Sequence, residues 1–253
     1  MSTMTPVRVG LGPTLKLRPA EIAVVRRILV LVVKIVAGVV PIAALLMTGV
    51  VAAIAATSSI TQSTWEIAGQ WPRWWLFVAG ITAVTTYLPV LVTHGMTRWA
   101  VFRALGLAGL LTCSLWTAAM VVGHVVERFA YARFGWPDRM TTSHLFGNGY
   151  DVLPMILEYE LIFLAYTVAG ALIGAVYYRF GGIRGTLLLP LAGLPGAIVE
   201  ALVSGWYQSE DRVGLPDSAS AGLALVLMSV ATIVLGAAVL HLVIRDVPIQ
   251  SKK

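Results

Sequence analysis

Six stretches of mostly apolar residues recur along the chain, each about as long as a helix that crosses a lipid bilayer. Such a helix needs about 20 apolar residues, because the hydrocarbon core is roughly 30 Å thick. The sequence therefore predicts an all-α, polytopic membrane protein. The six predicted spans cover residues 28–56, 74–93, 105–126, 156–178, 186–203 and 221–244.

Composition supports this class and excludes others. Of 253 residues, 58% are hydrophobic and only 12% are charged, with a mean hydropathy of +0.85. A soluble domain is about 25% charged, and one with so little polar surface would expose large apolar patches. The even spacing of the apolar stretches predicts one transmembrane domain over 1–253. The single cysteine, Cys113, excludes an intrachain disulfide and a cysteine metal motif, and we expect no metal site.

The lysines and arginines predict the orientation in the cell membrane. Most of the 18 lie before the first span, after the last one, or in the short segments 94–104 and 179–185. Because cytoplasmic segments are enriched in these residues, we expect both termini in the cytoplasm. The basic face would contact anionic membrane lipid, and nucleic acid is not an expected partner. The segments expected outside are 57–73, 127–155 and 204–220.

The stretch 15–29, "LKLRPAEIAVVRRIL", predicts an amphipathic interfacial helix before the first span. Pro19 and Glu21 suit a first helical turn, and apolar residues then recur at helical spacing between arginines. Such a helix can lie along the inner membrane surface. The same pattern also fits a plain extension of the first span, and both readings remain open.

Soluble-enzyme motifs are absent. The sequence contains no G-x-x-x-x-G-K-[ST] phosphate loop, no H-E-x-x-H and no G-x-S-x-G, so no nucleotide-binding domain is expected. Glu200 lies in the fifth predicted span with Pro190 and Pro195, which predict a kinked or broken helix. Broken helices line substrate paths in transporters, so these three residues are candidates for such a path. Alternatively, Glu200 pairs with an arginine at the outer interface.

A membrane-embedded enzyme acting on lipid or peptide is a second hypothesis, with His144, Glu158, Glu160 or Glu200 as acid/base groups. It requires that these four side chains gather in one polar cavity. A third hypothesis is a non-transporting sensor or immunity protein.

Residues 94–104, "HGMTRWAVFRA", join the second and third predicted spans. Gly95 permits a sharp bend, and Thr97 can cap a short helix that starts near Arg98. Trp99, Phe102 and Leu105 then recur at helical spacing, with Arg98 and Arg103 on other faces of the helix. A basic, aromatic surface of this kind suits docking into a groove of a partner protein.

The stretch "HGMTRWAVF" (94–102) resembles the cytoplasmic coupling helix of the six-span permease subunits of type-2 ATP-binding-cassette (ABC) exporters. This family serves bacterial drug, antibiotic and peptide export. Gly95, Thr97, Arg98 and Phe102 match its pattern, whereas Trp99 stands where a second basic residue is common. The segment 204–220 is polar where the family often has a re-entrant apolar segment.

The resemblance implies a non-catalytic permease that works as a dimer, with itself or with a homologous permease. It implies export of a hydrophobic or amphiphilic substrate, driven by a separate ABC ATPase subunit that carries ATP and Mg²⁺, with no cofactor in this chain. The residues that would couple to the ATPase are His94, Gly95, Met96, Thr97, Arg98, Trp99, Phe102 and Arg103.

Overall fold

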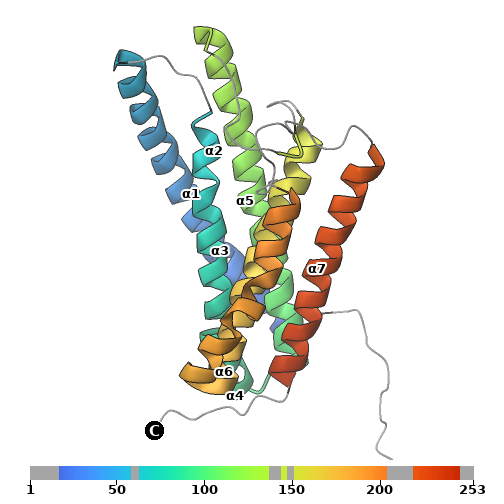
Figure 1. Ribbon diagram of the computed structural model, residues 1–253. Helices are drawn as coiled ribbons and strands as arrows, with labels where there is room; N and C mark the ends of the chain where they lie inside the picture. The colour runs from blue at the N-terminus through green and yellow to red at the C-terminus, as the bar shows by residue number, and fades with distance from the viewer. Residues whose placement is uncertain (1–16, 58–62, 137–143, 147–150, 204–218, 246–253) are drawn as a thin grey trace, which may run out of the picture.

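The computed structural model describes residues 17–57, 63–136, 144–146, 151–203 and 219–245. Within these ranges every regular element is a helix, and the long helices run side by side in an elongated bundle (Figure 1). The elements are α1 (Pro19–Thr57), α2 (Trp65–Ala68), α3 (Gln70–Thr82), the π-helix η1 (Ala83–Tyr87), α4 (Leu88–Thr93), α5 (Arg98–Phe134), α6 (Val152–Val203) and α7 (Ala219–Arg245).

Five helical stretches of the described chain are long and apolar enough to cross a membrane: α1, Trp65–Thr93, α5, α6 and the Gly222–Arg245 part of α7. This arrangement is compatible with a multi-pass membrane protein. Both chain ends and the polar segment 204–218 lie outside the described residues. The predicted cytoplasmic termini therefore stay predictions.

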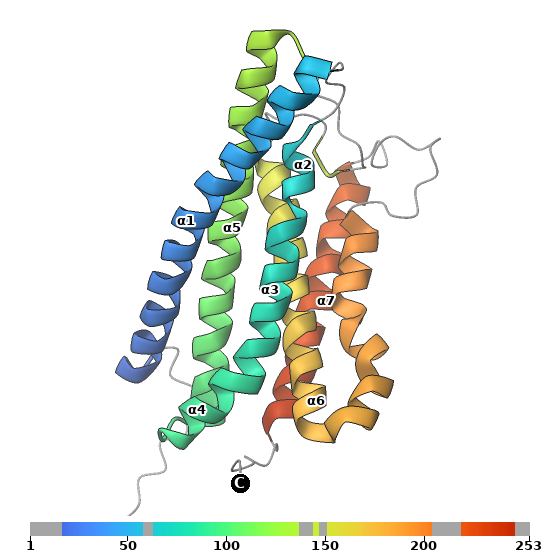
Figure 2. The same cartoon turned by 90° about the vertical axis from the view of Figure 1, so that its left-hand side faces the viewer.

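The fourth and fifth predicted spans form the single element α6. The backbone leaves the helical region at Gly181, where φ is 76° and ψ is −173°. The chain reverses there, and the two limbs run side by side in the second view (Figure 2). The Tyr177 hydroxyl lies 3.0 Å from the Thr186 hydroxyl across this turn. Glycine suits the position because its φ lies in the left-handed region, which a side chain disfavours.

Two short helices expected from the sequence are not separate elements. Residues 19–29 of the amphipathic stretch form the first turns of α1, and the stretch after Thr97 forms the first turns of α5. Both helices continue because the following residues contain no strong helix breaker before the bilayer-length apolar run. Of the two alternatives for the stretch before the first span, the structure shows the plain extension of that span.

The second predicted span begins earlier than its apolar pattern indicates. Helix starts at Trp65 rather than at residue 74, and it passes through the π-helix η1 before α4. Pro89 has no backbone N–H to donate to the carbonyl of Thr85, four residues earlier. This missing bond accounts for the wider helical turn at Ala83–Tyr87, since π-turns accommodate such breaks in the ladder.

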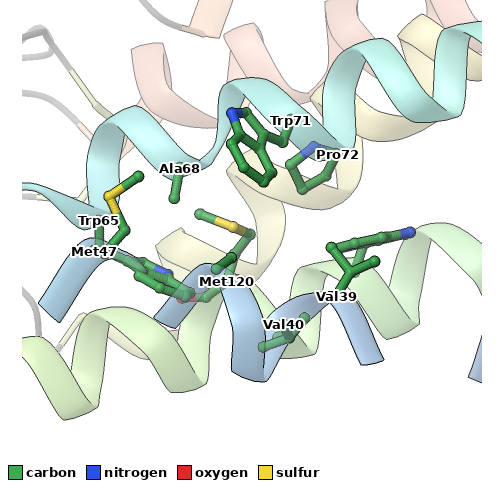
Figure 3. A pocket seen from close by; sticks show the side chains of 11 residues that line it. Val39, Val40, Met47, Trp65, Ala68, Trp71, Pro72 and Met120 are labelled. Carbon is green, nitrogen blue, oxygen red and sulfur yellow. The ribbon is translucent and has the colours of Figure 1, made fainter. Parts of the chain in front are cut away.

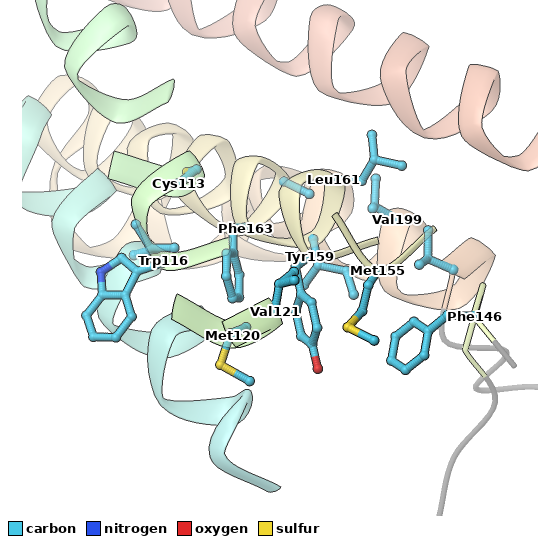
Figure 4. Close-up of a cluster of buried hydrophobic side chains, with 14 of the residues drawn as sticks. Cys113, Trp116, Met120, Val121, Phe146, Met155, Tyr159, Leu161, Phe163 and Val199 are labelled. Carbon is cyan, nitrogen blue, oxygen red and sulfur yellow. The ribbon is translucent and has the colours of Figure 1, made fainter. Parts of the chain in front are cut away.

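The first limb of α6 lies at the centre of the bundle. Its buried side chains, including Tyr159 and Phe163, pack against Trp116 and Met120 of α5 and Leu76 of α3. Figure 4 shows these aromatic and sulfur-containing side chains meeting between the helices. By contrast, α1 and α7 expose long apolar faces. In a bilayer those faces would contact lipid.

Helices α3 and α6 approach closely enough for their backbones to touch. A Cβ added to Gly80 would collide with the carbonyl oxygen of Thr167, and one added to Gly170 would collide with that of Phe77. Small residues at such crossings are typical of membrane helix pairs, because lipid gives no hydrophobic drive and close van der Waals contact replaces it. These glycines therefore set the distance between the two helices.

Candidate functional site

The bend between α4 and α5 is built as the sequence predicts. Gly95 has φ 89°, and its N–H donates to the carbonyl of Val92 at 2.9 Å. Thr97 is extended, and its hydroxyl accepts a bond from the N–H of Ala100 at 3.2 Å. The left-handed glycine ends one helix, and the threonine cap begins the next. The turn therefore joins the two helices through only a few residues.

Aromatic and basic side chains of the bend pack against the last turns of α7. The rings of Trp99 and Phe102 stack with centroids 5.7 Å apart, and both lie about 5 Å from the His241 ring. Arg98 Nη1 donates to the carbonyl of Arg245 at 2.6 Å. A cation at the carboxyl end of a helix compensates the helix dipole. Trp99 nevertheless remains 48% exposed.

The first turns of α1 join the same end of the bundle. The carboxylate of Glu21 is buried, accepts the N–H of Arg18 at 2.7 Å and lies 3.8 Å from Arg103 Nη2. Met96 packs on the same apolar cluster as Val25. The bend thus contacts the start of α1 and the end of α7. The remaining predicted residue, His94, is exposed, and its Nδ1 lies 2.7 Å from the Val90 carbonyl oxygen.

Glu200 pairs with an arginine, which was one of its two predicted environments. Its Oε1 lies 2.5 Å from Arg73 Nη1 of α3, and both side chains are largely buried. The second limb of α6 is not broken at Pro190 or Pro195, since within α6 only Gly181 leaves helical φ/ψ. Of the predicted kinked or broken helix, the break is therefore absent, because membrane helices tolerate proline when neighbouring groups compensate; a kink at these prolines stays a prediction.

A second polar cluster lies at the opposite end of the bundle. The His144 imidazole is buried between two carboxylates, with Nδ1 2.6 Å from Glu158 Oε1 and Nε2 3.3 Å from Glu66 Oε1. Glu158 also accepts the N–H of Leu145 at 2.6 Å. Burial lowers the pKa of His144, but hydrogen bonds and charges of Glu158 and Glu66 outweigh it and raise the pKa to about 9.

The four residues of the enzyme hypothesis do not gather in one cavity. His144 and Glu158 meet, whereas Glu160 faces Ser114 of α5 at 3.0 Å and Glu200 faces Arg73. Both ring nitrogens of His144 are occupied by carboxylates, so the ring acts as a cationic bridge. No group of three or more metal-ligating side chains that could hold an ion is found in the part of the chain described.

Glu66 is the member of this cluster that sequence reasoning missed. It follows Ser63 by three residues, and its N–H donates to the Ser63 hydroxyl at 3.3 Å. Serine followed three residues later by glutamate is the capping-box pattern of a helix start. That pattern could have placed the helix start near residue 65.

Comparison with known proteins gives no relative: no family model, no curated protein and no solved structure matches this chain.

Proposed function

We propose that this chain is the permease subunit of an ABC exporter, moving a hydrophobic or amphiphilic substrate across the cell membrane. The energy comes from ATP hydrolysed, with Mg²⁺, on a separate ATPase subunit. The permease pairs with a second copy or with a homologous permease. The observation that carries this proposal is the capped bend at residues 94–103, which joins two membrane-length helices and leaves Trp99 half exposed.

In this proposal the chain crosses the membrane six times. The spans are α1, the Trp65–Thr93 run, α5, the two limbs of α6 on either side of Gly181, and α7. The second limb, 182–203, has enough residues to cover the hydrocarbon core at 1.5 Å per residue. Its reversal at Gly181 supports counting α6 twice.

The bend lies on the cytoplasmic side in this proposal. Arg98, Arg103, Arg179 and Arg245 belong to one end of the bundle by their contacts. A concentration of arginine supports a cytoplasmic location under the positive-inside rule. The buried carboxylate cluster around Glu66 then belongs to the outer end.

The bend would act as a mechanical link. A groove on the ATPase would receive the first turn of α5, with Trp99 and Arg98 in contact with its walls. Because Gly95 and Thr97 connect α4 to α5 without a long loop, a displacement of the bend moves both helices together. ATP binding would then shift the permease between two conformations by stabilising one of them.

The first experiment tests the contact. A photo-crosslinking amino acid replaces Trp99 in the full chain, expressed in the native membrane, and Phe134 at the other end of α5 serves as the matched control. Phe134 is also an exposed aromatic residue, at 65%. We expect position 99 to capture a polypeptide that carries a phosphate loop and position 134 not to. Capture of no such ATPase from position 99 contradicts the proposal.

The second experiment tests the side. Cys113 is buried and is the sole cysteine, so Cys113→Ala gives a background for single cysteines. In intact cells, a membrane-impermeant maleimide should label Phe134→Cys and not Trp99→Cys. If the maleimide labels position 99 from outside the cell, the bend cannot contact a cytoplasmic ATPase, and the proposal is wrong.

A further inference from the structure

A half-buried carboxylate, that of Glu127, lies at the junction of α5 and the start of α2. Oε1 of Glu127 accepts the backbone N–H groups of Thr64 and Trp65 at 2.8 and 2.9 Å, and the Thr64 hydroxyl at 2.7 Å. Its Oε2 accepts the Ser63 hydroxyl at 2.5 Å. Backbone donors cannot turn away, so these bonds fix the carboxylate in place.

The other carboxylates at the two ends of the bundle mostly face cations, whereas Glu160 faces Ser114. Glu21 faces Arg103, Glu200 faces Arg73, and Glu66 and Glu158 share His144. No lysine, arginine or histidine pairs with Glu127 among the residues that the structure describes. A negative charge placed away from bulk water is costly, and a bound cation offsets that cost.

Glu127 lines one end of a long groove between α1 and α5 with a volume of about 630 Å³. Among the described residues that line the groove, Glu127 is the one charged residue, and the rest are almost entirely apolar, including Val36, Val40, Leu115 and Val122. The groove could therefore hold an apolar body along the helices, with a charged group at the Glu127 end.

Four aromatic side chains line the same end of the groove: Trp65, Tyr131, Phe134 and Trp136. Trp136 stacks on Phe134 with ring centroids 4.8 Å apart and meets Tyr131 edge-on at 5.6 Å. Aromatic faces attract organic cations, most strongly when the site is partly dry. Carboxylate and rings together select for a positive charge.

Trp65 is held rigidly in this wall. Its Nε1 donates to the carbonyl of Met120 at 3.1 Å. Its ring fills the space beside Gly123, where an added Cβ would collide with it. On its other side lies a small apolar pocket of about 30 Å³, where Trp65 and Met120 face Val40 of α1 (Figure 3). The Trp65 ring thus lines both the small pocket and the larger groove.

We propose that the groove between α1 and α5 binds a cationic amphiphile, an organic molecule with one positive charge and an apolar body. The cation lies at Glu127 among the four aromatic rings, and the apolar body lies along α1 and α5. That this ligand is the exported substrate rests on the proposed function, whereas the binding itself does not.

The test compares two ions of similar size and opposite charge. Tetraphenylphosphonium and tetraphenylborate are each dialysed to equilibrium against the purified full chain in neutral detergent, with empty micelles as reference. We expect the phosphonium to bind more tightly than the borate. Glu127→Gln should weaken phosphonium binding by about tenfold or more, because a charge pair in a partly dry groove is weakly screened. Glu160→Gln, which removes a carboxylate outside the groove, should leave binding unchanged.

A second pair of variants tests the apolar part of the groove. Ala118 lines it, so Ala118→Phe should fill space and weaken phosphonium binding. Ala238→Phe on the exposed face of α7 is the matched control. This pair, with the comparison of the two ions on the unchanged chain, decides the question even where Glu127→Gln fails to fold.

Equal affinity for the two ions, or unchanged phosphonium binding in a monodisperse Glu127→Gln variant, overturns the proposal. If Ala118→Phe dissociates a dimer but leaves phosphonium binding unchanged, the groove is instead the contact surface for a second copy of the chain. A co-purified phospholipid that the phosphonium cannot displace assigns it to lipid. If phosphonium binds as expected but position 99 captures no ATPase, the proposed exporter function is wrong and the proposed cation-binding site stands.

Discussion

Replacing His144 with glutamine removes a buried cation that joins two helices. In the folded chain its ring lies between Glu158 of α6 and Glu66 of α2, with 3% of its side chain exposed. Glutamine retains hydrogen bonding but leaves the two carboxylates without a positive charge between them. The loss should therefore depend on pH as the imidazole titrates.

The expected magnitude follows from the pKa of His144, which the two carboxylates raise from 6.5 to about 9 despite burial. Since the folded pKa is the higher one, the stabilisation is complete below pH 6.5 and is lost as the pH rises through 9. A shift of this size corresponds to about 3 kcal/mol. For a chain of this size that amounts to roughly 6 to 12 °C in apparent Tm.

The assay is thermal unfolding of the purified chain in detergent between pH 6 and pH 9. The unchanged chain should lose apparent Tm across this window, whereas His144→Gln should start lower and change little. His94→Gln, at the exposed bend, should keep the slope of the unchanged chain. A flat profile for the unchanged chain, or an equal slope in His144→Gln, would refute the reasoning.

Two further substitutions test packing and pairing by the same thermal assay. Arg73→Met leaves the Glu200 carboxylate buried without its cation and should destabilise the chain by about 3 to 5 kcal/mol, whereas Arg73→Met with Glu200→Leu should recover most of the loss. If the double variant is no more stable than Arg73→Met alone, Arg73 and Glu200 do not interact as a pair. Gly123→Ala forces Trp65 from its place and should cost about 1 to 3 kcal/mol. Gly106→Ala on the same helix meets nothing within 4 Å and should stabilise by up to about 1 kcal/mol, so equal effects at the two glycines contradict the close contact.

Features set by local sequence were predictable. Gly95 and Thr97 were expected to end one helix and cap the next, and both do. The short segment 179–185 was expected to join two spans, and the chain reverses there at Gly181. These positions depend on φ preference and side-chain capping, which act over a few residues.

Helix ends outside the apolar windows were not predictable from hydropathy. A hydropathy window measures the length that can lie in hydrocarbon, whereas a helix continues wherever its backbone bonds continue. Helix therefore starts at Trp65, where the Ser63 and Glu66 pattern marks it, and α5 runs on to Phe134.

Pairs far apart in sequence were the least predictable part of the site. Glu200 had several possible arginine partners, and the sequence could not select Arg73, which lies 127 positions away. The contact of His144 with Glu66 depends on how α2 meets α6, and no local pattern encodes that neighbourhood. The charge of such residues is evident from sequence, but their partners follow from helix packing.

The touching backbones of α3 and α6 restrict how this bundle can deform. Gly80 and Gly170 leave no side-chain layer between the two helices that could slide or change rotamer. These helices must therefore rotate or tilt as one rigid body. Widening of the bundle then falls to its borders, where α1 and α7 make fewer buried contacts and meet the surroundings.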